Sequence, residues 1–142
     1  MKNDKLKVLF ITPEVRIDVE PNHIPFWVGI LGAIAEQKGG QVAVLDLNAL
    51  RVKYGGKIVP TKIIADEIAS EKWDIIGIGG LTTTYSRIKK LSPLIRKYSP
   101  DSLFIGGGGW STYNPTEIFE LVPELDMIVI GEGEETFSEI YD

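Results

Sequence analysis

A run of four glycines, Gly106–Gly109, ends the apolar stretch that begins at Phe104 and is followed directly by Trp110 and Ser111. Glycine inside a strand destabilises a protein by roughly 0.5–1 kcal/mol relative to alanine, so the run needs a compensating role. Glycines let a ligand or a second backbone segment approach where a Cβ atom would block it. An indole can plug a core, but its large flat face also suits a flat ligand. Together these residues predict a site for a wide, planar cofactor.

Acids and hydroxyls also cluster in the sequence. Glu132, Glu134 and Glu135 look like a catalytic or metal-binding group, but carboxylates at a helix N-terminus are stabilised by its dipole, by about 0.3–1 kcal/mol each, and this structural role is favoured. Thr82–Thr84 could contact a ligand or cap a helix; since one cap needs one hydroxyl, ligand contact is favoured. The chain has no cysteine, and its single histidine, His23, has no partner at ligand spacing. The sequence therefore predicts no catalytic residue and no metal site.

The composition is that of one soluble domain. The chain has 142 residues, of which 44% are hydrophobic and 25% charged, and a formal net charge of -5. The basic residues are scattered apart from short clusters, which argues against nucleic acid as the main partner. No apolar stretch reaches the roughly 18–20 residues of a membrane span, and the first residues do not resemble a secretory signal. We expect a cytoplasmic protein with no membrane segment.

Five apolar runs alternate with helical patterns along the chain. The runs, interpreted as buried strands, are Lys7–Thr12, Gln41–Leu47, Asp74–Gly79, Ser102–Gly106 and Met127–Gly131. The helical patterns between them are Pro25–Lys38, Thr61–Lys72 with Thr61 as its expected N-cap, Ser86–Tyr98 and Pro115–Val122. Continuous apolar strands separated by helices are typical of a parallel sheet covered on both faces. We therefore predict an α/β fold, a three-layer doubly wound five-stranded parallel sheet in the flavodoxin-like order 2-1-3-4-5.

Ligands of such a sheet bind beyond the carboxyl ends of the strands. Four loops reach that edge and read TPEVRIDVEPNHIP, GGLTTTY, GGGGWSTYNP and GEGEET. A nicotinamide dinucleotide would require a glycine fingerprint in the first of them, which is missing even though Asp46 lies where a ribose-binding acid would be. A receiver domain would carry an aspartate in place of Gly79-Gly80. A flavodoxin would carry a hydroxyl-rich phosphate loop after the first strand. The sequence therefore disfavours a dinucleotide-binding domain, a receiver domain and a flavodoxin.

Five segments carry a family resemblance that spans nearly the whole chain: KVLFITPE, GILGAIAEQKGGQVAVLDLN, DIIGIGGLTTT, GGGWSTYNPTE and DMIVIGEGEETFSEI. In the last and most specific one, the run Gly131–Glu134 is followed by Thr136-Phe137. The sequence resembles the cobalamin-binding domains that precede the catalytic barrel of cobalamin-dependent radical S-adenosylmethionine enzymes. The resemblance implies a cobalamin site formed by Thr12, Pro13, Glu14, Leu81, Thr82, Thr83, Gly107, Gly108, Gly109, Trp110, Ser111, Gly131, Glu132 and Gly133.

The resemblance also implies how cobalamin is held. In mutases and methionine synthase, an Asp-x-His-x-x-Gly loop after the first strand supplies a histidine to cobalt. His23 does not lie in that motif, which the radical enzymes of this family generally lack. Trp110 stands where those enzymes often have histidine, and Gly79 where cobalamin-binding relatives often have serine. The implied state is cobalamin with its dimethylbenzimidazole tail displaced and no histidine on cobalt.

The same resemblance implies a longer enzyme. A helix that opens at about Glu135 has only about two turns before Asp142. We expect residues 1–142 to be a cobalamin-binding-like domain, truncated before a radical S-adenosylmethionine barrel in which a Cys-x-x-x-Cys-x-x-Cys motif holds a 4Fe-4S cluster and S-adenosylmethionine binds. The domain would be inactive alone and would hold cobalamin as a methyl carrier in a methyltransferase-like enzyme. The alternative is a cobalamin-free domain with a structural or substrate-docking role.

Overall fold

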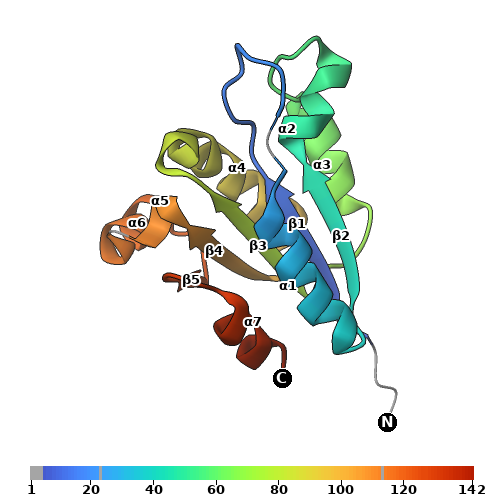
Figure 1. Cartoon of the computed structure of the whole chain (residues 1–142), viewed down its shortest axis with the longest axis vertical. Coiled ribbons are helices and arrows are strands. Elements are labelled where there is room, and N and C mark those ends of the chain that lie inside the picture. The colour runs from blue at the N-terminus through green and yellow to red at the C-terminus, as the bar shows by residue number, and fades with distance from the viewer. Residues whose placement is uncertain (1–4, 23, 113) are drawn as a thin grey trace.

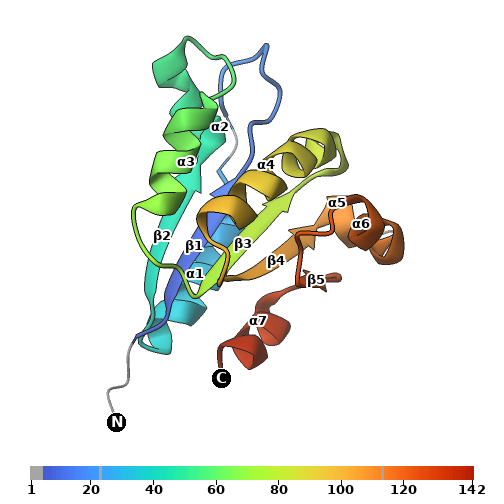
Figure 2. The ribbon, with the colours of Figure 1, turned by 180° about the vertical axis from the view of Figure 1, so that it is seen from behind.

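The computed structural model describes residues 5–22, 24–112 and 114–142. The strands are β1 (Lys7–Thr12), β2 (Gln41–Asp46), β3 (Ile75–Gly80), β4 (Leu103–Gly108) and β5 (Met127–Val129). They form one parallel sheet in the order β2-β1-β3-β4-β5, with helices on both faces (Figures 1 and 2). The predicted fold class and strand order are confirmed.

Each face of the sheet has its own core. Helices α1 (Phe26–Gln37) and α7 (Glu134–Tyr141) lie on one face, where they cover Val8 and Phe10. Helices α3 (Thr61–Ala69) and α4 (Tyr85–Tyr98) lie on the other face over Leu9 and Ile11, and the shorter α5 (Gly109–Thr112) and α6 (Pro115–Leu121) complete that core. Side chains alternate between the faces of a strand, so burial on both sides explains why the strands read as continuous apolar runs. No helix in the described ranges is long and apolar enough to cross a membrane.

Short helical turns at the carboxyl edge of the sheet were not predicted. They are α2 (Leu47–Leu50), η1 (Arg51–Tyr54) and η2 (Thr82–Thr84). Asp46, the candidate ribose ligand, instead caps α2: its Oδ1 accepts hydrogen bonds from Ala49 N at 3.1 Å and from Thr12 Oγ1 at 2.9 Å. These contacts tie the ends of β1 and β2 together.

Several predicted element ends are wrong: α3 ends at Ala69 rather than Lys72, and β5 at Val129 rather than Gly131. Thr61 is not the N-cap of α3 but its first residue, because Pro60, with an extended ψ of 137°, occupies the cap position. Strand β4 runs two residues beyond its predicted end, since Gly107 pairs with Gly79 and Gly108 with Gly80. Three of the four glycines therefore lie within the sheet, and α5 begins directly at Gly109.

Candidate functional site

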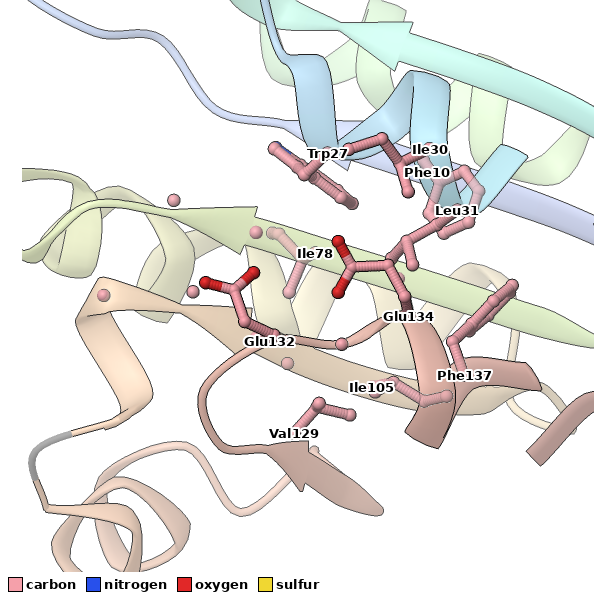
Figure 3. Close-up of a pocket in the computed structure, with 18 of the residues that line it drawn as sticks. Phe10, Trp27, Ile30, Leu31, Ile78, Ile105, Val129, Glu132, Glu134 and Phe137 are labelled. Carbon is pink, nitrogen blue, oxygen red and sulfur yellow. The ribbon is translucent and has the colours of Figure 1, made fainter. Parts of the chain in front are cut away.

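A cavity of about 610 Å³ lies between α1 and α7 at the carboxyl edge of the sheet. Trp27, Ile30 and Leu31 of α1 line one side, and Glu134 and Phe137 of α7 line the other (Figure 3). Residues of β3 and β4 form the floor, among them Gly77, Gly79, Ile105 and Gly107. Phe10 packs against Gly77 and Trp27 against Gly79, whereas at Gly107 the space between the two helices reaches down to the backbone of the sheet.

The four consecutive glycines have two different roles. A Cβ atom at Gly106 would lie 2.8 Å from Trp110 Cζ2, and one at Gly108, where φ is 99°, would lie 2.7 Å from Gly80 O. Internal packing therefore requires both of these glycines. A Cβ atom at Gly107 would meet nothing closer than 3.8 Å, and one at Gly109 nothing within 4 Å, although both residues line the cavity. Only Gly107 and Gly109 leave room that a ligand could fill.

Trp110 lies in the core rather than in the cavity. Its side chain belongs to the α3/α4 core with 5% of its surface exposed. Its Nε1 donates to Gly107 O at 2.8 Å, and its ring stacks on Tyr85 with 6.4 Å between centroids. The indole that lines the cavity is that of Trp27, which meets Phe10 edge-on at 5.6 Å and lies 2.8 Å from the position of a Cβ atom at Gly79.

Thr12 at the end of β1 and Pro13 in the loop after it line a smaller cavity of about 30 Å³. This cavity shares Trp27 and the segment 79–81 with the large one, so the two are neighbours along the same edge. Glu14 points elsewhere: it accepts two hydrogen bonds from Arg87, at 2.8 and 2.9 Å, and one from Val59 N at 2.9 Å. With 1% of its side chain exposed, the Glu14 carboxylate is committed to a buried ion pair.

The remaining predicted residues divide between the cavity and its surroundings. Leu81 and the segment 131–133 line the cavity. Thr82 and Thr83 are exposed on η2 and do not line it, whereas Thr84 is buried and donates to Leu81 O at 2.7 Å. Ser111 is fully buried and donates to Gly108 O at 3.2 Å. Trp110, Ser111 and Glu14 thus support the edge of the sheet from within.

The charge in the cavity is negative. Glu132 and Glu134 turn their carboxylates into it (Figure 3), and none of the described residues that line it is Lys, Arg or His. An apolar cavity without a cation favours an uncharged, apolar group inside and keeps a phosphate outside. Within the described ranges no group of three His, Cys, Asp or Glu side chains could hold a metal ion, and His23 lies outside these ranges.

Sequence reasoning missed the contribution of α1. The cavity is lined by Ile24, Phe26, Trp27 and Ile30, and Phe26 keeps 75% of its surface exposed. The signal was present in FWVGILGAIA, which is apolar all round, whereas a helix that covers a sheet needs only one apolar stripe. The surplus apolar residues indicate a second surface that α1 offers to another group.

Known proteins resemble this chain in sequence and in fold. A family model described as "B12 binding domain" matches residues 14–141. The chain is 25% identical over 133 residues to the anaerobic magnesium-protoporphyrin IX monomethyl ester cyclase of Rubrivivax gelatinosus, covering 92% of this chain and 23% of that protein. It is 26% identical over 117 residues to the cobalamin-dependent radical SAM methyltransferase TokK of Streptomyces tokunonensis, covering 82% and 16% of the two chains.

A solved structure shows the same fold. The radical S-adenosylmethionine methyltransferase TsrM from Kitasatospora setae, with cobalamin and a [4Fe-4S] cluster bound, superposes with a TM-score of 0.78 at 21% identity. The match covers 96% of this chain and 26% of TsrM. The chain therefore spans about a quarter or less of the length of each of these three proteins.

Proposed function

This chain belongs to the B12-binding domain family, and we propose that it holds cobalamin at the carboxyl edge of its sheet for a radical S-adenosylmethionine enzyme. The observation that carries the proposal is the glycine-floored cavity between α1 and α7. Its volume of about 610 Å³, its apolar lining and the open positions beside Gly107 and Gly109 fit a large, mostly uncharged cofactor.

The parts of cobalamin fit different parts of the edge. We assign the displaced dimethylbenzimidazole tail to the cavity, because this ring is apolar and the cavity offers Trp27, Phe137 and the floor glycines. The phosphate of the tail stays outside, away from Glu132 and Glu134. The corrin ring is proposed to cover the edge itself, beside Leu81 and the open positions at Gly107 and Gly109. Thr12, Pro13, Thr82 and Thr83 are its proposed contacts at the rim.

The lower face of cobalt is proposed to have no histidine ligand. Within the described part of the loop after β1, residues 13–22 and 24–25, the side chains are apolar, carboxylate, amide or arginine. Trp110 takes a supporting role in this proposal, since its Nε1 bond to Gly107 O holds the glycine run from the opposite face of the sheet. Because the Trp110 ring is buried in the α3/α4 core, it is assigned no direct contact with the corrin.

We propose that a downstream barrel supplies the rest of the enzyme. The chain spans 16% of TokK and 26% of TsrM, which leaves most of such a protein to other domains. In the proposed enzyme that barrel holds the 4Fe-4S cluster and S-adenosylmethionine. Bound cobalamin would carry the methyl group of a methyltransferase reaction, while the residues of this chain bind and orient the cofactor.

A titration of the protein with hydroxocobalamin, followed by absorbance, tests the proposal. We expect saturable binding and the spectrum of a tail-displaced form, unchanged in His23→Ala. Trp27→Ala should weaken binding by about 1–3 kcal/mol, the usual loss when an aromatic platform is truncated. The matched control is Trp73→Phe, because Trp73 is buried on the opposite face, where its Nε1 donates to Ile68 O.

Three different results of this titration would contradict different parts of the proposal. Loss of binding in His23→Ala would show that a histidine holds the cofactor. If Trp27→Ala bound hydroxocobalamin with the affinity of the wild type, the dimethylbenzimidazole tail would not lie in the cavity. A protein that binds no cobalamin, alone or joined to its barrel, would instead favour the structural or substrate-docking role.

A further inference from the structure

One buried side chain holds much of the long loop between β1 and α1. Arg51, the first residue of η1, has only 1% of its surface exposed. Its Nη1 donates to the main-chain carbonyls of Ile17 at 3.1 Å and Gly56 at 3.0 Å. Its Nη2 donates to the carbonyls of Val15, Arg16 and Val19. The guanidinium thus gathers four carbonyl groups of a loop that has no regular secondary structure there.

The partners of Arg51 are neutral. Its Nε donates to Asn48 Oδ1 at 3.1 Å, and none of the ion pairs between described residues includes it. Arg87 and Arg96, by contrast, each bind a carboxylate. A buried cation is tolerated only when its hydrogen-bonding groups are satisfied, and here backbone carbonyls satisfy most of them. The burial of Arg51 and the path of the loop therefore depend on each other.

The clamped loop forms part of the cofactor edge. Asn48 Oδ1 also accepts a hydrogen bond from Val15 N at 3.0 Å. Val15 and Asn48 both line the smaller cavity of about 30 Å³ and a further one of about 170 Å³. Both of these cavities share Leu81 with the large cavity. Asn48 thus lies at this edge itself, and the buried Arg51 donates a hydrogen bond to it from within the protein.

The loop has a conformation that needs such support. Arg16 has φ of 50°, and it is the only described residue other than glycine with a positive φ. This region of backbone space is unfavourable for a side chain with a Cβ atom and persists where surrounding contacts impose it. The carbonyl of Arg16 is one of those that the Arg51 guanidinium binds, at 3.2 Å.

We infer that Arg51 is a positioning residue for the cofactor site. It fixes the β1–α1 loop beside the cavities at the carboxyl edge of the sheet before any ligand binds. The loop then does not have to be ordered during binding. The fork of five N–H donors is essential to this role, because a lysine provides only three donors from a single point. The inference rests on the proposed function and adds to it a residue that does not touch the cofactor.

The test compares Arg51→Lys with Arg96→Lys in hydroxocobalamin affinity, thermal stability and amide hydrogen exchange. Arg96 is the matched control: it donates to the carbonyls of Pro100, Ser102 and Glu124 near the opposite edge of the sheet, where β4 and β5 begin. Arg51→Lys should speed exchange in residues 15–20 of the ligand-free protein and weaken affinity by about tenfold or more. Arg96→Lys should leave affinity within about twofold of the wild type, because the site is distant.

Asn48→Ala provides a second variant should Arg51→Lys fold poorly. It removes the acceptor shared by Arg51 Nε and Val15 N without a change in charge, and we expect the same direction of effect. The positioning role would be overturned if Arg51→Lys and Asn48→Ala both kept the amide exchange rates and the hydroxocobalamin affinity of the wild type. An equal loss of affinity in Arg96→Lys at matched thermal stability would also overturn it. A wild-type protein that binds no cobalamin would overturn the proposed function, and the positioning role with it.

Discussion

Among single residues, Gly106 and Gly107 separate the requirements of folding from those of binding. They are adjacent on β4 and therefore face opposite sides of the sheet. The Gly106 side is filled by the Trp110 indole and by Leu125, whereas the Gly107 side opens into the cavity. Substitutions at these two neighbours should have opposite consequences.

Gly107→Val should abolish cobalamin binding with little loss of stability. The valine side chain enters the cavity, where the nearest atoms to its Cβ are those of Val129 at 3.8 Å, so we expect the free energy of unfolding to stay within about 0.5 kcal/mol of wild type. Gly106→Ala should instead lose about 1–3 kcal/mol of stability by overpacking. Urea unfolding and cobalamin titration of both variants measure the contrast. Normal affinity in Gly107→Val would place the ligand elsewhere.

The sequence indicated the loops of the site better than its individual contacts. A glycine run at the end of an apolar strand identifies the cavity edge, because few other features require so many missing side chains. It does not show that Trp110 turns into the α3/α4 core while Trp27 lines the cavity. That choice depends on the direction in which α5 leaves β4 and on how α1 crosses the sheet, which are properties of tertiary packing. The ion pair of Glu14 with Arg87 likewise depends on tertiary packing, because the two residues are 73 positions apart in the sequence.

Among the elements, β4 and β5 are held at their amino ends by one ion pair. Asp126 accepts hydrogen bonds from Phe104 N at 2.8 Å and from Arg96 Nη2 at 2.7 Å. Burial by itself raises the pKa of the Asp126 carboxyl, but the Phe104 amide and the Arg96 guanidinium together outweigh it, so its pKa lies below its usual value of 3.8. A carboxyl whose pKa falls on folding stabilises the protein where it is ionised.

Asp126→Asn should therefore destabilise the protein in a pH-dependent way. The contribution of Asp126 is fully present above pH 3.8, the value for the unfolded chain, and is lost as the pH falls through the lower folded pKa. Urea unfolding at neutral pH should separate wild type from variant, and the gap should shrink below pH 3.8. The exposed pair Lys62–Asp66 provides the control, since Asp66→Asn should have almost no effect at either pH. A gap that widens on acidification would contradict the assignment.

Apolar patterns in the sequence located all five strands and the longer helices, and missed the short helical turns. Strands and helices that bury one or both faces over six or more residues leave a repeating pattern, as β1 and α4 do. The four-residue α2 and η1 are too short for a pattern and form because Asp46 caps the turn and Arg51 anchors it. The end of β4 was placed too early because glycine is a poor strand former. Backbone pairing with Gly79 and Gly80 outweighs that preference.

At the scale of the whole molecule, a ligand in the cavity should stabilise the packing of α1 and α7 on the sheet. The cavity lies between α1 and α7, so a ligand inside contacts both helices and the sheet at once. Cobalamin should stabilise the native state by about 2.7 kcal/mol at a concentration 100 times its Kd. Cobinamide, which lacks the nucleotide tail, should give a smaller shift in Tm at the same concentration, because it leaves the cavity unfilled. Equal shifts for the two corrinoids would exclude the tail from the space between α1 and α7.

The direction of α7 constrains any protein fused to this domain. The helix begins beside the cavity at Glu134 and runs for eight residues to Tyr141, so its far end lies about 12 Å from its start. An engineered partner fused at Asp142 of this 142-residue chain reaches the cavity only if its linker spans that distance, which takes at least about four extended residues. A shorter linker would hold the two apart however well their surfaces match, and a much longer one would dilute the partner by lowering its effective concentration. Linker length thus becomes an adjustable variable in chimaeric proteins that carry this domain.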